Sequence, residues 1–306
     1  MHSKVILAGG RGFLGAALAR HLAASGHEVV VLSRSPAEGG PARQVAWDGR
    51  TDGPWRAELD GAAAVVNLTG RSVNCLPTPA NRAEILASRL DSVRALGAAC
   101  AAVAHPPRVW VQSSSLAIYG SPGERVCDET APLADDFPAS VCRQWEAALA
   151  AAAPAATRTV VLRIGLVLGP GGGALGPLVR LTRWFLGGTV GSGRQYLSWL
   201  HLDDMNAIFA DAIGRDDWRG AYNACAPEPA ANADFMRELR RAVGRPWSPP
   251  APAWAVRLGA RWLLRTDPDL ALSGRRCVPA RLRAQGFAFR FPALKPALAD
   301  VARRGW

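Results

Sequence analysis

Three glycines, Gly9, Gly12 and Gly15, are spaced so that they could hold a phosphate group. They follow the apolar run 5–8 and precede a stretch with helical patterning, 16–24. At such a strand-to-helix turn the first glycine permits a tight turn, the second lets the backbone approach a pyrophosphate, and the third lets the helix pack on the strand. Free N–H groups at the helix N-terminus attract the phosphate charge. The spacing therefore predicts a dinucleotide site, against the alternative of a purely structural turn.

The residues after the second apolar run, 27–32, indicate which dinucleotide is bound. A site that prefers NAD places a carboxylate here, about 20 residues after the glycines, on the ribose 2′-hydroxyl. This chain has Ser33 and Arg34 instead, and Arg11 lies inside the glycine loop. A guanidinium binds a 2′-phosphate that a carboxylate would repel. We therefore expect NADP(H) rather than NAD(H); the alternative is that both arginines are merely solvated in an Arg-rich chain.

Length, composition and charge favour an enzyme-sized protein with a small-molecule partner. At 306 residues and 49 % hydrophobic content, the chain can form one large domain or two unequal ones. It has no run of 18 apolar residues and no leader-like start, which predicts a cytoplasmic protein without a membrane partner. The net charge of +11 comes from arginines scattered among acids, which argues against nucleic-acid binding. Six cysteines without a CxxC pair predict neither a metal site nor a disulfide framework.

The elements that must position these residues alternate along the chain. Strand-like runs lie at 5–8, 27–32, 43–47, 63–68, 108–112 and 159–164, and the clearest helices between them span 81–104 and 140–153. This alternation predicts right-handed βαβ units and an α/β fold with a doubly wound parallel sheet. The pattern loosens from about residue 166, and a proline-rich linker spans 247–252. We expect a dinucleotide-binding domain over 1–246 with substrate-side insertions from about 166, and a small C-terminal region over 247–306.

Several motifs, in order, resemble the extended short-chain dehydrogenase/reductase superfamily of nucleotide-sugar epimerases, whose cofactor domain is a Rossmann fold. Besides the glycine loop, they are Asn67-Leu68-Thr69-Gly70, Ser113-Ser114-Ser115-Leu116-Ala117-Ile118-Tyr119-Gly120, Leu162-Arg163 through Gly169-Pro170-Gly171, and Trp199-Leu200-His201-Leu202-Asp203-Asp204-Met205. The loop 191–199 and the tail 272–292 resemble one subgroup, the "epimerase family" proteins with a short C-terminal domain of unknown function. The resemblance covers nearly the whole chain.

The resemblance and the glycine loop together imply a set of site residues. Ser115 matches the family's catalytic serine, and Tyr119 lies just past it. The residues expected to bind the cofactor are Gly9, Arg11, Gly12, Phe13, Leu14, Gly15, Ser33, Arg34, Asn67, Leu68, Thr69, Gly70, Ser113 and Arg163.

The chain departs from the superfamily in its acid–base residues. Members usually place Tyr and Lys four residues apart on the helix after the fifth strand, where Lys lowers the Tyr pKa for proton transfer. Here those positions fall near Pro138 and Cys142. The only tyrosines, at 119, 196 and 222, have Gly123, Leu200 and Ala226 four residues on. The usual pair is therefore absent from this sequence.

Other side chains could take over the role of the missing Tyr–Lys pair. One of the serines at 113–115 either binds a substrate carbonyl or caps backbone at the strand end. Tyr119 is either a general acid or a structural residue. Cys142 is expected to be buried packing, His201 to be structural beside a helix cap, and Arg194 to be either an anion ligand or a solvated loop residue.

Two functions remain open. The first is an NADP(H)-dependent epimerase- or reductase-like enzyme acting on a small carbonyl or sugar-like substrate. The second is a non-catalytic NADP(H)-binding sensor or assembly protein, which the missing pair keeps open because general acid–base catalysis supplies about 10²–10⁴ in rate. A homodimer is compatible with either function.

Overall fold

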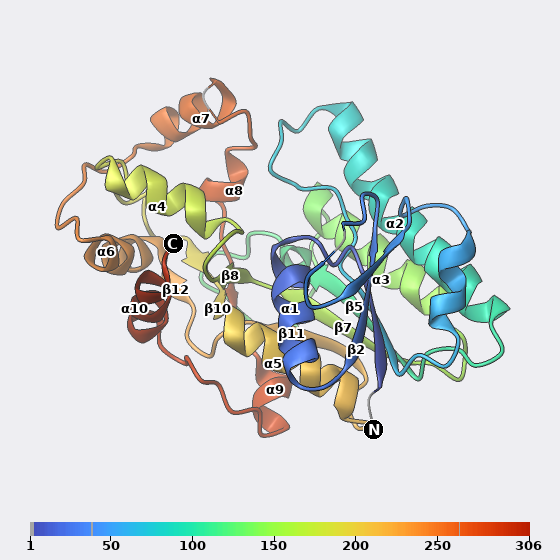
Figure 1. The fold of residues 1–306 in the computed structure, drawn as a ribbon. Helices are drawn as coiled ribbons and strands as arrows, with labels where there is room; N and C mark the ends of the chain where they lie inside the picture. The colour runs from blue at the N-terminus through green and yellow to red at the C-terminus, as the bar shows by residue number, and fades with distance from the viewer. Residues whose placement is uncertain (1–2, 38, 263) are drawn as a thin grey trace.

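The structure is a computed structural model, and it describes residues 3–37, 39–262 and 264–306. Figure 1 shows a larger lobe built on a central sheet and a smaller lobe beside it, with the C-terminus in the smaller lobe. We call the smaller one, made of helices α4, α6, α7, α8 and α10, the small lobe. No described helix is long and apolar enough to cross a membrane.

The central sheet has seven strands, all parallel, in the order β11-β7-β5-β4-β1-β2-β3. Their bounds are β1 (Lys4–Ala8), β2 (Glu28–Ser33), β3 (Arg43–Ala46), β4 (Ala64–Asn67), β5 (Val109–Ser115), β7 (Arg158–Ile164) and β11 (Gly220–Ala224). The order reverses between β1 and β4, and ligands of such sheets bind outside the carboxyl ends of the strands at this switch point. The predicted doubly wound parallel sheet is confirmed.

Helices cover both faces of the sheet because its central strands are apolar on both sides. On one face α1 (Phe13–Ala24) and α5 (Leu202–Gly214) bury Leu18, Leu22 and Phe209. On the other, α2 (Pro79–Ala102), α3 (Phe137–Ala152) and the 3-10 helix η1 (Pro54–Leu59) bury a second core that includes Leu96 and Trp145.

Helix α3 begins earlier than its apolar pattern predicts. Asp136 caps it by accepting a hydrogen bond from the Ala139 N–H, and Pro138 lies in the first turn, where it needs no N–H partner. The helix therefore carries Cys142 and Glu146 one turn apart, on the side that packs against the end of β5.

The small lobe has its own core. Helices α4 (Leu175–Arg183), α6 (Asn232–Val243) and α10 (Leu294–Arg304) contribute Val179, Phe235 and Leu298 to it. Two further helices, α7 (Ala253–Trp262) and α8 (Asp269–Leu272), follow the proline-rich segment. Short strand pairs connect this region to the rest: β8 (Leu166–Leu168) with β10 (Trp199–His201), and β9 (Tyr196–Leu197) with β12 (Ala230–Ala231).

The last part of the chain returns to the large lobe. Strand β13 (Arg276–Cys277) pairs with β6 (Val126–Cys127), and α9 (Ala280–Ala284) packs on β11. The Arg281 guanidinium donates to the Ala221 carbonyl at 2.6 Å. Residues beyond 247 therefore contact both lobes, and the boundary at 246/247 stays a prediction.

Candidate functional site

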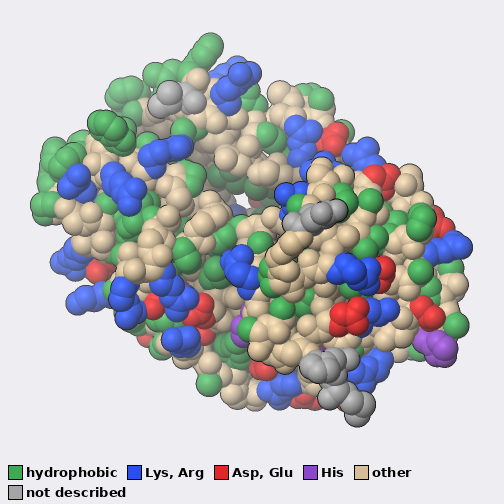
Figure 2. All heavy atoms as spheres, in the orientation of Figure 1, with side chains coloured by type: hydrophobic (Ala, Val, Ile, Leu, Met, Phe, Trp, Pro, Cys, Tyr) green, Lys and Arg blue, Asp and Glu red, His purple; other side chains and the backbone are tan. Residues whose placement is uncertain are grey.

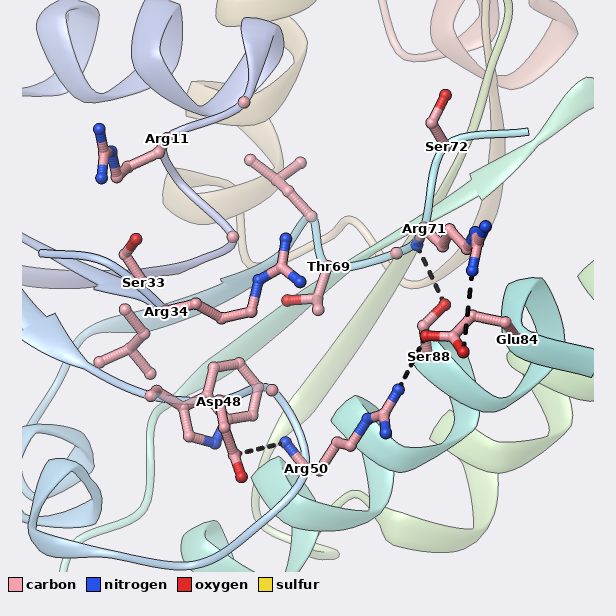
Figure 3. A pocket seen from close by; sticks show the side chains of 17 residues that line it. Arg11, Ser33, Arg34, Asp48, Arg50, Thr69, Arg71, Ser72, Glu84 and Ser88 are labelled. Atoms are coloured by element: carbon pink, nitrogen blue, oxygen red, sulfur yellow. Dashed lines mark hydrogen bonds and ion pairs between the residues drawn. The ribbon is translucent and has the colours of Figure 1, made fainter. Parts of the chain in front are cut away.

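A cavity of about 810 Å³ lies at the carboxyl ends of β1, β2 and β4, at the switch point of the sheet. Its walls come from the glycine loop, the end of β2, the loops after β3 and β4, and the first half of α2, as Figure 3 shows. Eight of the predicted cofactor residues line it: Gly9, Arg11, Gly12, Ser33, Arg34, Leu68, Thr69 and Gly70.

The glycine loop has the close contacts that its spacing predicts. Gly9 has φ +76° and lies so near the loop after β4 that a Cβ would stand 3.1 Å from the Thr69 Cα. A Cβ on Gly15 would come within 2.5 Å of the Gly10 Cα, so helix and loop are in direct contact. A Cβ on Gly12, in contrast, would meet only the Gly9 carbonyl oxygen, at 3.7 Å. The loop is therefore packed at Gly9 and Gly15 and open to the cavity at Gly12.

The N-terminus of α1 faces this open position. Gly12 caps the helix without any side-chain hydrogen bond to its first turn. The first N–H groups of a helix have no intrahelical partner, so this terminus can receive an anion. Phe13, Leu14 and Gly15 form that first turn and contribute backbone rather than cavity-lining side chains.

Arg34 occupies the middle of the cavity. Its side chain extends from the end of β2 toward Thr69 in Figure 3, and its guanidinium has no hydrogen bond or ion pair with any described residue. Arg11 behaves differently, because it donates to the Ser35 carbonyl and lies at the rim. Of the two arginines expected to select a 2′-phosphate, Arg34 is the one that remains available.

The loop after β3 is part of the site and was missed from the sequence. Trp47, Asp48, Gly49 and Arg50 all line the cavity. The Asp48 carboxylate accepts hydrogen bonds from the backbone N–H groups of Thr51 and Arg50, which hold its pKa below the ordinary value. The available signal was position, since this loop follows a strand of the sheet at its carboxyl end.

Helix α2 contributes a polar wall that sequence reasoning also missed. It supplies Glu84 and Ser88, while Arg71 and Ser72 come from the loop after β4. The Arg71 backbone N–H donates to the Ser88 hydroxyl at 3.0 Å, and the Glu84 carboxylate binds the Arg50 guanidinium at 3.0 Å (Figure 3). These contacts connect α2 to the loops after β4 and β3 beside the cavity. No sequence spacing links these residues, because they meet only through the fold.

Asn67 holds the loop after β4 in place through buried hydrogen bonds. It is fully buried; its amide nitrogen donates to the Gln112 side chain at 3.1 Å and its oxygen accepts from the Thr69 N–H at 3.0 Å. The Thr69 hydroxyl is buried without a partner among the described residues. Asn67 therefore positions the residues that line the cavity, and Thr69 has an unused polar group there.

The serines at the end of β5 have three different environments. The Ser113 hydroxyl is buried without a described partner, and Ser114 donates to the Glu146 carboxylate at 2.6 Å. The Ser115 hydroxyl oxygen accepts a hydrogen bond from the Ala117 N–H at 3.2 Å and so caps backbone at the end of the strand. That bond uses a lone pair of Ser115 and leaves its O–H free to donate.

Tyr119 belongs to a buried network rather than to the cavity. It is 1 % exposed; its hydroxyl donates to the Asn223 side chain at 2.8 Å and accepts from Arg163 at 2.8 Å. Burial raises the pKa of Tyr119 far above its ordinary value. Arg163 also forms two hydrogen bonds with Glu146. This placement argues against general-acid chemistry at Tyr119 and against direct cofactor contact by Arg163.

The remaining candidates lie outside the cavity, and each has a described environment of its own. Cys142 is buried, and burial raises the pKa of its thiol to about 11. His201 caps α5 by accepting the Asp203 N–H at 3.1 Å, and burial lowers its pKa. Arg194 pairs with Glu124 on the surface.

His201, Asp203 and Asp300 lie close enough together to hold a metal ion. Both carboxylates are already bound by arginines: Asp203 accepts from Arg304 at 2.7 Å, and Asp300 pairs with the same guanidinium at 2.7 Å. The cluster therefore holds α10 against the start of α5.

Residues 5–225 match the NAD dependent epimerase/dehydratase family, and residues 251–301 match a domain of unknown function, DUF1731. The chain is 38 % identical over 304 residues to the epimerase family protein SDR39U1 of Bos taurus, covering 97 % of this chain and 99 % of the relative.

One solved structure and one plant relative add to this. The crystal structure of human epimerase family protein SDR39U1 (isoform2) with NADPH superimposes with a TM-score of 0.88 at 34 % identity, covering 98 % of this chain and 99 % of that chain. A relative from Arabidopsis thaliana, 32 % identical over 97 % of this chain and 86 % of its own length, is named as chloroplastic. The cytoplasmic location expected from the sequence therefore stays a prediction.

Proposed function

Because the chain belongs to the NAD dependent epimerase/dehydratase family, we propose that it binds NADP(H) in the cavity at the switch point. We further propose that it acts as an epimerase- or reductase-like enzyme on a small carbonyl or sugar-like substrate. The observation that carries the choice of NADP(H) is Arg34, an unpaired guanidinium in the middle of the cavity. The relative that was crystallised with NADPH supports the same choice, since it is similar over nearly the whole chain.

The cofactor would be held mainly by backbone and by one charge. The N–H groups at the start of α1, next to the open position at Gly12, suit a pyrophosphate. Arg34 suits a 2′-phosphate, and the buried Thr69 hydroxyl offers a further hydrogen bond. A homodimer and the absence of a nucleic-acid partner remain part of the proposal.

A bound nicotinamide supplies hydride transfer, and residues of the chain must orient the substrate. Ser115 keeps a free O–H at the end of β5, which can orient a substrate carbonyl. Ser113 has a buried hydroxyl with no described partner beside it. Without the Tyr–Lys pair, proton transfer must come from the substrate, from water or from another group of the chain.

A non-catalytic NADP(H) sensor is the second candidate, and one observation favours it. Tyr119, the tyrosine nearest the serines, has its hydroxyl satisfied inside the core by Asn223 and Arg163. A protein that only binds the dinucleotide has no need of a general acid at this position.

The first test is titration of the protein with NADPH and NADH by fluorescence, for the wild type and for Arg34→Ala. We expect Arg34→Ala to weaken NADPH binding by about 10- to 100-fold, the worth of a charge-assisted hydrogen bond, and to leave NADH binding unchanged. The matched control is Arg20→Ala, an exposed arginine of α1 outside the cavity. Equal loss with both nucleotides, or no binding of either, would contradict the proposal.

The second test separates the enzyme from the sensor. Oxidation of NADPH is followed with a panel of small aldehydes, ketones and keto sugars. An enzyme turns over at least one of them, and turnover falls in Ser115→Ala while NADPH binding stays. Tight NADPH binding with no turnover across the panel favours the sensor.

A further inference from the structure

Large apolar side chains gather on the outside of the small lobe. Of the twelve large hydrophobic side chains that are exposed in the described part of the chain, nine lie between residues 184 and 270. Figure 2 shows hydrophobic side chains projecting at the outer edge of this lobe, over the helices α4 and α7 of Figure 1, with basic side chains beside them. Soluble proteins rarely expose so many apolar side chains together, so this surface indicates a contact. We call its members Trp184, Phe185, Trp247, Trp254, Leu258 and Trp262 the tryptophan patch; each is 45–76 % exposed.

The tryptophan patch joins two segments that are far apart in the sequence. Arg245 connects them, because its Nε donates to the Arg183 carbonyl at 3.2 Å and its guanidinium stacks on Phe185, 5.0 Å from the ring centre. Just before α7, the Ala251 N–H donates to the Thr189 carbonyl at 2.8 Å. The end of α4 and the start of α7 therefore belong to one surface.

Helix α7 reverses the burial pattern that is usual in a soluble domain. Its one fully buried residue is the small Ala260, whereas Trp254, Leu258 and Trp262 are exposed. Residues four apart lie on the same side of a helix, so these three form one apolar stripe that faces solvent. A surface helix normally turns its large apolar side chains toward the core. The stripe on α7 is therefore available to something outside the protein.

Phe185 is held in a backbone conformation that a bulky residue disfavours. It directly follows the cap residue of α4 and has a φ of +58°, in the left-handed region that glycine usually occupies at this position. Its side chain is 45 % exposed, so burial in the core does not account for a phenylalanine here. Backbone strain of this kind is concentrated at functional sites, which is a second indication that the surface makes a contact.

Arginines without acidic partners flank the tryptophan patch. Residues 239–266 contain six arginines and no Asp or Glu. On α7, Arg257 and Arg261 are exposed beside the apolar stripe, and neither side chain has a hydrogen bond or ion pair with a described residue. On the neighbouring α6, in contrast, Arg237 pairs with Asp234 at 2.7 Å. The positive charge around the patch is therefore uncompensated.

This charge decides between the occupants that such a surface could have. A two-fold contact with a second copy of the chain would bring the same arginines together with no carboxylate between them, and such like-charge contacts are costly. An anionic lipid surface supplies the opposite charge. Tryptophan is also the side chain that favours the boundary between lipid headgroups and acyl chains, and basic residues beside it strengthen the attachment.

We propose that the tryptophan patch docks this protein on the surface of an anionic phospholipid bilayer. Helix α7 lies along the surface, with Trp254 and Trp262 in the headgroup layer and Arg257 and Arg261 against lipid phosphates. Such a contact needs no membrane-spanning helix, so it replaces the expectation, drawn from the missing apolar run, of a protein without a membrane partner. It goes beyond the proposed function and does not depend on NADP(H) binding.

The test is flotation of the full chain with lipid vesicles. Vesicles of phosphatidylcholine alone are compared with vesicles of equal parts phosphatidylcholine and phosphatidylglycerol. We expect the anionic vesicles to bind at least about tenfold more tightly, because basic residues are attracted to a negative surface. Molar salt should remove this difference, since it shortens the Debye length to about 3 Å. Equal binding to the two kinds of vesicle, or binding to neither, would overturn the proposal.

The double variant Arg257→Gln/Arg261→Gln tests the basic half of the surface. It should weaken binding to the anionic vesicles about 10- to 30-fold, at roughly fivefold for each basic residue near the membrane. The matched control, Arg20→Gln/Arg108→Gln, removes the same charge from exposed positions of the large lobe and should keep the affinity within about twofold. An equal loss in the control would show that net charge alone drives binding, which contradicts a specific docking surface.

The double variant Trp254→Ser/Trp262→Ser tests the apolar half. Both side chains are exposed, so the melting temperature should stay unchanged while the affinity for anionic vesicles falls at least about tenfold. Leu133→Ser, at an exposed position of the large lobe, is the control and should bind as the wild type does. Full affinity in the tryptophan variant would refute docking through the patch. Sedimentation velocity without lipid completes the test, because a dimer that this variant dissociates would assign the patch to self-association instead.

Discussion

Glu146 binds Arg163 through two parallel hydrogen bonds, from Nε to Oε1 at 3.0 Å and from Nη2 to Oε2 at 2.9 Å. The pair joins α3 to β7, and both side chains are largely buried, 17 % and 8 % exposed. Although burial opposes it, the Glu146 carboxylate keeps the pKa of Arg163 above its ordinary value. The region of the usual acid–base pair is therefore fixed by an internal ion pair, which has several testable consequences.

Removing one partner of this pair should be costly. Glu146→Gln leaves the buried Arg163 without a counter-charge, and breaking such a pair costs about 3–5 kcal/mol of unfolding free energy. Urea denaturation measures the loss. Arg143→Gln is the control on the same helix, because its partner Asp135 is 90 % exposed and such surface pairs contribute about 0–1 kcal/mol. A similar loss of unfolding free energy in both variants would mean that the buried Glu146–Arg163 pair stabilises the fold no more than a surface pair does.

Tyr119→Phe should affect stability more than cofactor binding. The change removes the donor to the Asn223 side-chain oxygen and one acceptor of Arg163 inside the core, at a cost of about 1–3 kcal/mol. NADPH affinity should stay within about twofold, since the hydroxyl lies outside the cavity. Unchanged stability together with lost turnover would restore Tyr119 as the general acid.

The glycine loop predicts a contrast between two conservative substitutions. Gly15→Ala should destabilise the protein by about 1–3 kcal/mol, because the new Cβ would meet backbone of Gly10 at 2.5 Å. Gly12→Ala should keep the melting temperature and weaken NADPH binding at least tenfold, since its methyl group enters space meant for a ligand. Thermal melts and NADPH titration separate the two effects. Wild-type NADPH affinity in Gly12→Ala would show that no pyrophosphate approaches this loop.

His201 predicts how stability depends on pH. Burial lowers the pKa of its imidazole, near Asp203, Asp300, Arg290 and Arg304, from an ordinary value of about 6.5. Between the two pKa values the unfolded chain binds a proton and the folded chain does not. The contribution of His201 to the free energy of unfolding is therefore fully present above about pH 6.5 and declines as the pH falls toward the folded pKa.

Chemical denaturation at pH 7.5 and at pH 6.0 should show this decline, and His201→Asn, which can still cap α5, should reduce it. His105→Asn, at an exposed site, is the control. Asp204, whose pKa burial raises, acts with the opposite sign, in the pH range between its folded pKa and the ordinary Asp value of about 3.9. A slope that is identical in wild type and His201→Asn would refute the role of His201.

Local patterning was enough to predict the large lobe. Most central strands of the sheet are short apolar runs followed by a turn, and the glycine loop marks the first crossover, so the order of the sheet strands along the chain up to β7 follows from sequence. The cavity was only half predicted. Arg34 and Gly12 lie in a known pattern, whereas Glu84 and Ser88 face the cavity because α2 packs where it does, which no spacing reveals.

Short strands were missed for a related reason. Strand β13 has two residues, and its partner β6 lies about 150 positions earlier in the chain, so neither has a local signal. Tyr119 and Arg163 illustrate the same limit for function. Their motifs match the family, but only the packed structure shows that their polar groups are satisfied by Asn223 and Glu146.

The return of the C-terminal part to the large lobe has a consequence for biosynthesis. Arg304, in the last helix α10, binds Asp203 at the start of α5, and β13 completes a strand pair with β6. These contacts cannot form until the segment 276–304 has left the ribosome. The nascent chain can assemble its glycine loop early, yet it fixes the start of α5 only after that much later segment has been made.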